Sequence, residues 1–263
     1  MKQRLNKNIF NNLINIQDVT NNVSMLSKTL PSLNIDSIFI EQDGKTQKYF
    51  YKEEQLHELR SCAKILVAMA IGIAIDKKLS ISSETLTLNT KIFPVIKDVT
   101  NKNNIKKIKE WTIKDLLTHT TGYEAQMMSE RFIQDIDDNK LVDYALNYDI
   151  PYEVGVRFAY NNVEPFILSV FFQEAFNQNL ADFIDENIFK KVNILDYKWE
   201  KYGKYCPGAT GLYLKHSDFH KIGQLLLNEG KYNNNQIVSS SWIKEMCSIK
   251  LKTIRFTRYV SRF

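Results

Sequence analysis

Two short stretches of the sequence hold residues whose types and spacing could do chemistry. In the first, "SCAK", Ser61 stands three positions before Lys64, so on a helix the two side chains share one face. A serine hydroxyl needs a base to take its proton, and a lysine can be that base when burial lowers its pKa. An uncharged run, Ile65 to Ile75, follows and would bury the lysine. Ser61 and Lys64 are therefore the candidate nucleophile and base.

The same spacing also has an ordinary explanation, because S-x-x-K is expected by chance about once in a chain of this length. A second copy does occur, "SWIK", from Ser241 to Lys244. It follows a run of serines and opens a short amphipathic segment, where serine is typical of a helix cap and lysine of a solvated side chain. For Ser61 and Lys64 the competing interpretation is a helix that starts at the surface, with the lysine reaching outward to water.

The second stretch, "YNN", begins at Tyr160 and ends at Asn162, in a polar turn before a predicted helix at 164–176. A tyrosine can relay a proton with a lysine, and an asparagine amide can orient both a lysine and a substrate carbonyl. Tyr160 is thus a candidate catalytic residue and Asn162 a candidate substrate-binding residue. The competing interpretation is an Asx-type helix cap, since the segment "GKYNNNQIV" repeats the pattern in an ordinary asparagine-rich turn.

Local signals predict the elements that must position these residues. Residues 37–52 alternate in polarity around Asp43 and Gly44, which predicts a two-stranded hairpin. The run 61–78 has the length of a helix and is apolar on every side, which predicts a buried one.

A further helix is predicted at 111–122, between the two candidate stretches. Thr112 and Asp115 have the spacing of a capping box, and Gly122 is a typical stop.

Composition narrows the class of protein. The 263 residues are 44% hydrophobic and 25% charged, as in ordinary globular proteins, and we expect a single domain over 1–263. The net charge of +5 is mild, and the basic run at 101–110 lacks interleaved aromatic residues, so no nucleic-acid partner is expected. No apolar run reaches the ~18 residues of a membrane span, and the N-terminus lacks a signal-peptide pattern, which indicates a cytoplasmic protein without a membrane span.

The cysteine count bears on metals and disulfides. Cys62, Cys206 and Cys247 are three in number and widely spaced, which fits neither a disulfide framework nor a zinc pattern. We interpret them as reduced thiols and expect no metal site.

Four segments in order resemble the penicillin-recognising serine hydrolases, and within them the class C β-lactamase and D-alanyl-D-alanine peptidase branch. They are "SCAK", "TIKDLLTHTTGY", "YNN" and "GATGLYLKHSDFHKIGQLLLNEGKYNNNQIVSSSWIKEM". The resemblance implies an α+β, β-lactamase/transpeptidase-like fold, a helical lobe at about 80–200 plus an antiparallel sheet, as two interleaved lobes. It also implies a serine hydrolase that forms an acyl-enzyme without a cofactor.

The resemblance assigns roles residue by residue. Ser61 becomes the acylated nucleophile and Lys64 its base or proton partner. Tyr160 becomes the proton relay at the leaving group, and Asn162 positions the substrate and Lys64. His119, in the second segment, becomes a structural residue rather than a general base. Cys62 is expected to be a small packed side chain.

The sequence departs from the family after Met246, where only residues 247–263 follow. Family members continue into three strands, one of which bears Lys-Thr-Gly or His-x-Gly and supplies the second oxyanion-hole N–H. The tail contains Lys252 and Thr253 but then Ile254, which is a poor match. The expectation is a truncated chain with an incomplete sheet.

The substrate expected from the resemblance is a small molecule or peptide with an amide or ester bond, such as a β-lactam, a D-amino-acid peptide or a carboxylic ester. Two alternatives to an active hydrolase stay open: an inactive remnant of the same fold, and an interaction protein. The oligomeric state is not predicted.

Overall fold

The computed structural model describes residues 35–99, 105–124, 127–248, 250–252 and 259–260. The chain forms two compact units, Met1–Gln55 and Leu56–Phe263, which we describe separately. Helices and antiparallel strands occur together, so the predicted α+β class is confirmed. The predicted single domain with a helical lobe at about 80–200 stays a prediction.

The described part of the first unit is the predicted hairpin of β1 (Ser37–Gln42) and β2 (Lys45–Phe50). The strands pair antiparallel, from Ser37 opposite Phe50 to Gln42 opposite Lys45. Both turn residues have positive φ, 51° at Asp43 and 73° at Gly44. Such a two-residue turn matches the right-handed twist of the strands, and this is why Asp-Gly predicts it.

The strands of the second unit are short. They are β3 (His57–Glu58), β4 (Ser80–Ile81), β5 (Glu84–Thr85), β6 (Lys198–Trp199), β7 (Leu212–Leu214), β8 (Lys231–Tyr232), β9 (Asn235–Gln236), β10 (Leu251–Lys252) and β11 (Tyr259–Val260). In the described residues β3, β7 and β6 form a three-stranded antiparallel sheet, and the others pair two by two.

Helices are the main regular structure of the second unit. They are α3 (Ala63–Asp76), α4 (Phe93–Ile96), α5 (Ile105–Ile108), α6 (Ile113–Leu117), α7 (Glu130–Ile133), α8 (Leu141–Asn147), α9 (Val163–Phe176), α10 (Leu180–Ile184), α11 (His216–Leu227) and α12 (Ser240–Met246). Single turns are η2 (Arg60–Cys62), η3 (Lys97–Val99), η5 (Asp138–Lys140), η6 (Asp185–Phe189) and η7 (Lys190–Val192).

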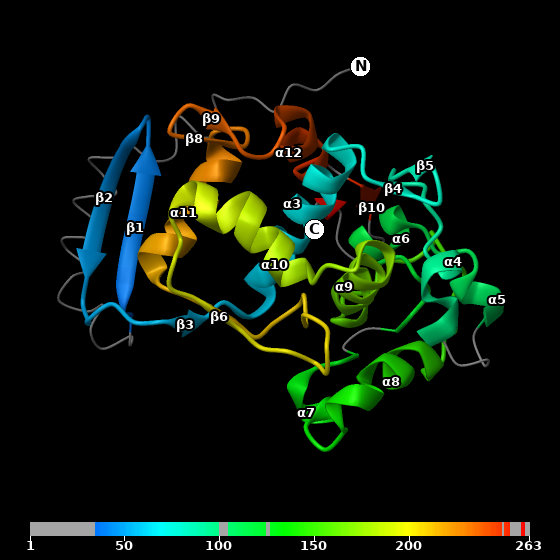
Figure 1. The fold of residues 1–263 in the computed structure, drawn as a ribbon. Helices are drawn as coiled ribbons and strands as arrows, with labels where there is room; N and C mark the ends of the chain where they lie inside the picture. The colour runs from blue at the N-terminus through cyan, green and yellow to red at the C-terminus, as the bar shows by residue number, and fades with distance from the viewer. Residues whose placement is uncertain (1–34, 100–104, 125–126, 249, 253–258, 261–263) are drawn as a thin grey trace. The chain divides into compact units, whose positions relative to one another are not determined.

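Helix α3 lies at the centre of this unit, where it packs against α9, α10 and α12 (Figure 1). Its residues are buried on all sides over most of its length, which confirms the predicted buried helix. The indole of Trp242, on α12, donates to the Ala68 carbonyl at 2.9 Å. A Cβ on Gly72 would lie 2.2 Å from that indole, so only glycine allows the two helices to approach this closely.

Helix α6 begins where predicted but ends earlier. The Thr112 hydroxyl accepts from the Asp115 N–H, and the Asp115 carboxylate accepts from the Thr112 N–H, which confirms the capping box. The helix ends at Leu117, five residues before Gly122.

The backbone after α6 explains the early end of the helix. His119 has a φ of 53°, and the His119 and Thr120 N–H groups donate back to the Leu116 and Asp115 carbonyls at 3.3 Å and 2.9 Å, as in a left-handed helix cap. Residues 152–159 then bond to the segment beyond the cap: Ala159 N–H donates to the His119 carbonyl at 3.0 Å and Gly155 N–H to the Thr120 carbonyl at 2.8 Å. The side chains of 118–121 are buried.

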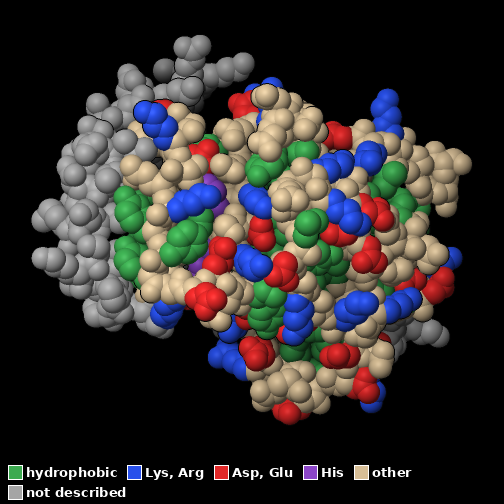
Figure 2. Space-filling model, turned by 60° about the vertical axis from the view of Figure 1, so that its left-hand side comes forward, with side chains coloured by type: hydrophobic (Ala, Val, Ile, Leu, Met, Phe, Trp, Pro, Cys, Tyr) green, Lys and Arg blue, Asp and Glu red, His purple; other side chains and the backbone are tan. Residues whose placement is uncertain are grey.

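The surface charges are mixed. On the face drawn in Figure 2, Lys and Arg side chains alternate with Asp and Glu side chains. Among the helices of the described residues, none has the length and apolar character needed to cross a membrane. Of the basic run at 101–110, residues 101–104 lie outside the described residues, and Ile105–Ile108 form α5.

Candidate active site

The turn that carries Ser61 follows directly from the three-stranded sheet. Strand β3 pairs with β7, and the Leu59 N–H extends this pairing to the Leu212 carbonyl at 2.7 Å. Arg60 then has a φ of 50°, a left-handed conformation that is rare for residues other than glycine. Ser61 follows in η2 with an exposed side chain, immediately before α3. Strained residues are common next to catalytic groups, and this one turns the chain sharply just before Ser61.

Lys64 lies in the first turn of α3 with 4% of its surface exposed. Its Nζ is 3.1 Å from the Ser61 Oγ and 2.8 Å from the Asn162 Oδ1, both within hydrogen-bond distance. The predicted pairing of serine and lysine on one helical face is therefore present in the structure. Lys64 is not the outward-reaching side chain of the competing interpretation.

Asn162 and Tyr160 come from the turn before α9, where Asn162 is the N-cap. The Asn162 side-chain NH₂ donates to the Met128 carbonyl at 3.1 Å, and this contact directs its oxygen toward Lys64. The Lys64 Nζ lies 4.7 Å from the centre of the Tyr160 ring. All four sequence-predicted residues thus meet around one ammonium group.

The electrostatics of Lys64 suit a base. Burial lowers the pKa of Lys64 from its ordinary value of 10.5, and this is the largest influence. The Tyr160 phenol, the Glu164 carboxylate and the Cys62 thiol act in the opposite direction and raise the pKa of Lys64. The net direction is downward, which increases the neutral fraction that can accept a proton from Ser61.

The sequence profile of the Beta-lactamase family matches residues 37–240, which include Ser61, Lys64, Tyr160 and Asn162. The chain belongs to the Beta-lactamase family. Comparison with curated protein sequences finds no match. The resemblance seen in the sequence motifs is thereby confirmed at the level of the superfamily.

Solved structures share the fold of this Beta-lactamase family member. The octameric penicillin-binding protein homologue from Pyrococcus abyssi is 15% identical with a TM-score of 0.69, over 91% of this chain and 62% of that one. The class C β-lactamase from Rhodobacter sphaeroides is 16% identical with a TM-score of 0.65, over 90% of this chain and 73% of that one. A putative 6-aminohexanoate-dimer hydrolase from Bacillus anthracis is 22% identical with a TM-score of 0.62, over 83% and 61%.

These likenesses establish the β-lactamase/transpeptidase-like fold, with small antiparallel sheets in the described residues. The chain spans about two thirds of the length of these structures, from 61% to 73%. Of the tail motif considered in the sequence, Thr253 and Ile254 lie outside the described residues.

A cleft of about 450 Å³ opens beside the reactive pair, and Ser61 and Asn162 both line it. Its described lining carries one guanidinium and four carboxylates: Arg60, Glu58, Glu130, Asp138 and Glu200. The guanidinium is shared, with Nε 2.9 Å from the carboxylate of Glu58 and an Nη 3.6 Å from that of Glu130. The lining is therefore acidic.

The raised pKa of the Tyr202 phenol is consistent with this acidic lining. Burial, together with the four carboxylates of the lining, raises the pKa of Tyr202 to about 12. The sequence motifs gave no indication of this acidic lining, because its residues come from segments far apart in the chain.

A buried polar cluster behind Tyr160 was also missed in the sequence. Glu164 in α9 is fully buried, and its carboxylate contacts His119, Thr121 and Asn161. The available signal was a carboxylate within a helix that is otherwise apolar from Val163 to Phe172, since such a charge requires buried partners. His119 belongs to this cluster through its contact with Glu164. In the described residues no hydrogen bond joins His119 to Ser61.

The structure also tests the predictions for Cys62 and for the second S-x-x-K copy. Cys62 is exposed and not packed, because the turn of η2 directs its side chain away from the core. In the second S-x-x-K copy the helix cap is Ser239 and not Ser241, which lies in the first turn of α12. Lys244 is exposed, as expected, and pairs with Glu229 at 2.9 Å. The cysteines at 62, 206 and 247 are all free thiols, as predicted.

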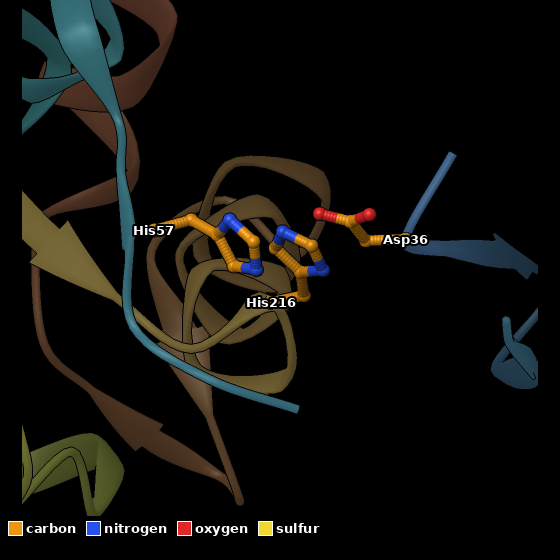
Figure 3. A group of neighbouring side chains, drawn as sticks. All are labelled: Asp36, His57 and His216. Atoms are coloured by element: carbon orange, nitrogen blue, oxygen red, sulfur yellow. The ribbon is translucent and has the colours of Figure 1, made fainter. Parts of the chain in front are cut away.

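His57 and His216 are two further side chains capable of chemistry that lie together (Figure 3). Their rings stack at 4.2 Å between centroids with 17° between planes. Two histidines are fewer than the three or four protein ligands of a zinc site. Asp36, the third residue labelled in Figure 3, belongs to the first unit.

Proposed function

We propose that the chain is a serine hydrolase of the β-lactamase-related type, which cleaves an amide or ester through an acyl-enzyme on Ser61. The observation that carries this proposal is the pair of contacts from the Lys64 Nζ, 3.1 Å to the Ser61 Oγ and 2.8 Å to the Asn162 Oδ1. A buried lysine with a lowered pKa beside an exposed serine has the arrangement that an activated nucleophile requires.

Acylation begins when the Ser61 Oγ attacks the substrate carbonyl carbon. Its proton passes to the neutral amine of Lys64, and the carbonyl π electrons move to the oxygen of a tetrahedral intermediate. The carbonyl then reforms, the bond to the leaving group breaks, and the leaving nitrogen or oxygen takes a proton. Tyr160, whose ring lies 4.7 Å from the Lys64 Nζ, is the proposed relay for that proton.

Deacylation uses the same groups in the second half of the cycle. A water molecule attacks the ester carbonyl and gives its proton to the Tyr160 and Lys64 pair, and the Ser61 Oγ leaves with a proton returned from Lys64. Asn162 fixes the position of Lys64 through both steps, because its amide is held by the Met128 carbonyl. No metal or cofactor is assigned a step in this cycle.

The acidic cleft bears on the substrate. Anionic acyl groups would face the carboxylates of Glu58, Glu130 and Glu200, whereas uncharged or cationic groups would not be repelled. We therefore expect substrates with neutral or amine-bearing acyl groups to be hydrolysed faster than substrates with carboxylate-bearing acyl groups. Among the similar structures, the Bacillus anthracis protein is named for hydrolysis of an amino compound, the 6-aminohexanoate dimer.

The test is covalent labelling of the whole chain. A fluorophosphonate probe is expected to add to the wild type and not to Ser61→Ala, with intact-protein mass spectrometry as the measurement. Ser241→Ala is the matched control, since Ser241 has the same spacing to a lysine but is exposed in the first turn of α12, away from Lys64. Absence of an adduct in a folded wild type would instead favour an inactive member of the same fold.

A further inference from the structure

The carboxylate of Glu164 stands at the centre of a fully satisfied buried cluster. Its Oε1 accepts from the Thr121 hydroxyl at 2.7 Å and from the Asn161 side-chain NH₂ at 3.1 Å. Its Oε2 lies 3.1 Å from the His119 Nδ1. Glu164 and its three partners each have 2% or less of their surface exposed. Both oxygens of the buried carboxylate therefore have polar partners.

The same cluster fixes the backbone of the turn that carries the candidate site. Asn161 accepts from the Val163 N–H at 2.8 Å and donates to the Ala159 carbonyl at 3.1 Å, while it also donates to Glu164. These bonds enclose Tyr160 and Asn162 on both sides. A displacement of Asn161 would therefore move the relay and the amide that holds Lys64.

His119 connects the cluster to the reactive groups. Its ring lies 5.3 Å from the Tyr160 ring, and the Lys64 Nζ lies 4.7 Å from the centre of that same ring. The titratable groups that act on Lys64 are thus Tyr160 from the turn, Glu164 from α9 and Cys62 from η2, with His119 beside Tyr160.

We propose that Glu164 is a positioning residue: its buried carboxylate holds the turn of Tyr160 and Asn162 in place and balances the positive charge that Lys64 acquires during catalysis. This inference rests on the proposed function of Ser61 and Lys64. The negative charge of Glu164 favours the ammonium form, so it opposes the desolvation of Lys64. Removal of the charge should leave Lys64 neutral down to a lower pH.

The first experiment separates the charge of Glu164 from its shape. Glu164→Gln keeps the size of the side chain, and the Gln amide can still contact His119 if the imidazole changes tautomer. Glu174→Gln is the control, because Glu174 lies on the same helix but bonds to Tyr205 and pairs with Lys204. The measurement is an NMR titration of lysine labelled at Cε, which requires no substrate.

The titration midpoint of Lys64 is expected to move to lower pH in Glu164→Gln, by on the order of one pH unit or less, as for a single nearby charge that is partly screened. The control should keep the wild-type midpoint. An unchanged or higher midpoint in folded Glu164→Gln overturns the proposed charge balance. Because this readout does not depend on labelling, it stays informative even if Ser61 proves unreactive.

A second variant tests the positioning role of Glu164. It also keeps the proposal testable if Glu164→Gln does not fold. Glu164→Asp keeps the charge but shortens the side chain by one methylene, so the carboxylate cannot hold all its partners. We expect a ten- to hundredfold slower reaction of Ser61 with the fluorophosphonate probe, about the effect of a small misplacement at a reactive centre. The Lys64 midpoint should stay near that of the wild type. A wild-type labelling rate in folded Glu164→Asp overturns the positioning role.

Discussion

The Lys64 Nζ donates to the Asn162 Oδ1 at 2.8 Å although the two residues are 98 positions apart in the sequence. The contact joins the first turn of α3 to the N-cap of α9. Both ends are constrained, Lys64 by burial and Asn162 by its bond to the Met128 carbonyl. The position of the ammonium group relative to Ser61 is therefore set by tertiary structure and not by the S-x-x-K spacing alone.

Replacement of Asn162 by Asp should slow the labelling of Ser61 at neutral pH. A carboxylate within hydrogen-bond distance of Lys64 would stabilise the ammonium form and raise the pKa of Lys64 by about 1 to 3 units. Since the neutral amine is the proposed base, the rise of the labelling rate with pH should move upward by the same amount. The measurement is the probe-labelling rate of Asn162→Asp between pH 5 and about pH 10.

Asn234→Asp is the control for this pH profile, because Asn234 lies in the exposed turn between β8 and β9. Its profile should match that of the wild type. If Asn162→Asp also keeps the wild-type profile, the ionisation of Lys64 does not govern the reactivity of Ser61.

Replacement of Lys64 by Met should stabilise the fold while it abolishes labelling. Burial lowers the pKa of Lys64 in the folded chain below 10.5, so between the two values the unfolded chain binds more protons. The free energy of unfolding of the wild type therefore rises with pH through this window, and the burial cost is fully present below it. Lys64→Met lacks this cost and should be more stable at pH 7, by on the order of 1 kcal/mol.

The stability difference between Lys64→Met and the wild type should shrink as pH is raised toward 10.5. Urea unfolding at several pH values measures both free energies. Lys244→Met is the matched control, since Lys244 is exposed. A Lys64→Met variant that is less stable than the wild type at pH 7 would mean that the contacts to Ser61 and Asn162 outweigh the desolvation of Lys64.

Local signals predicted those parts of the structure that local interactions determine. The Asp43–Gly44 hairpin, the capping box at Thr112 and the buried helix α3 each depend on residues adjacent in sequence or on one helical repeat. The reactive pair of Ser61 and Lys64 belongs to the same group, because three positions on a helix bring their side chains together.

Features that depend on distant segments were not predicted. The bonds that join the segment after α6 to residues 152–159 have no signal in either stretch of sequence. The sheet of β3, β7 and β6 joins strands of two or three residues, which are too short to give an alternating pattern. Glu164 was visible only as a charge in an apolar helix, and its partners became apparent only in the fold.

Neutralisation of Glu200 should change the preference of the cleft for charged substrates. Glu200 lines the cleft and accepts from the Tyr213 hydroxyl at 3.1 Å, so Gln can replace it with little change of shape. In Glu200→Gln the ratio of hydrolysis rates for an amine-bearing ester over a carboxylate-bearing ester should fall several-fold. Added salt should reduce the same ratio in the wild type, because it screens exposed charges.

Glu186→Gln serves as the control for substrate charge, since Glu186 is exposed and bonds to Gln178 away from the cleft lining. The ratio in this variant should equal that of the wild type. A ratio that is equal in all three proteins, or one that rises in Glu200→Gln, would show that the acidic lining does not select the substrate.

The contact between α3 and α12 gives a prediction about stability that is independent of any activity. A methyl group on Gly72 would overlap the Trp242 indole, which is itself fixed by its bond to the Ala68 carbonyl. Gly72→Ala should therefore lower the free energy of unfolding by about 1–3 kcal/mol, the usual cost of overpacking a core.

Gly223 in α11 is the matched comparison for Gly72. It is also a helical glycine, but beyond its chain neighbours and its own helix backbone no heavy atom lies within 4 Å of the position that its Cβ would occupy. Gly223→Ala should then raise the free energy of unfolding by roughly 0.5–1 kcal/mol, because alanine loses less backbone entropy than glycine in a helix. Urea unfolding of both variants measures the two effects with opposite expected signs. If Gly72→Ala were as stable as Gly223→Ala, α12 would not pack on α3 through Trp242, and the helix face behind Lys64 would lack this support.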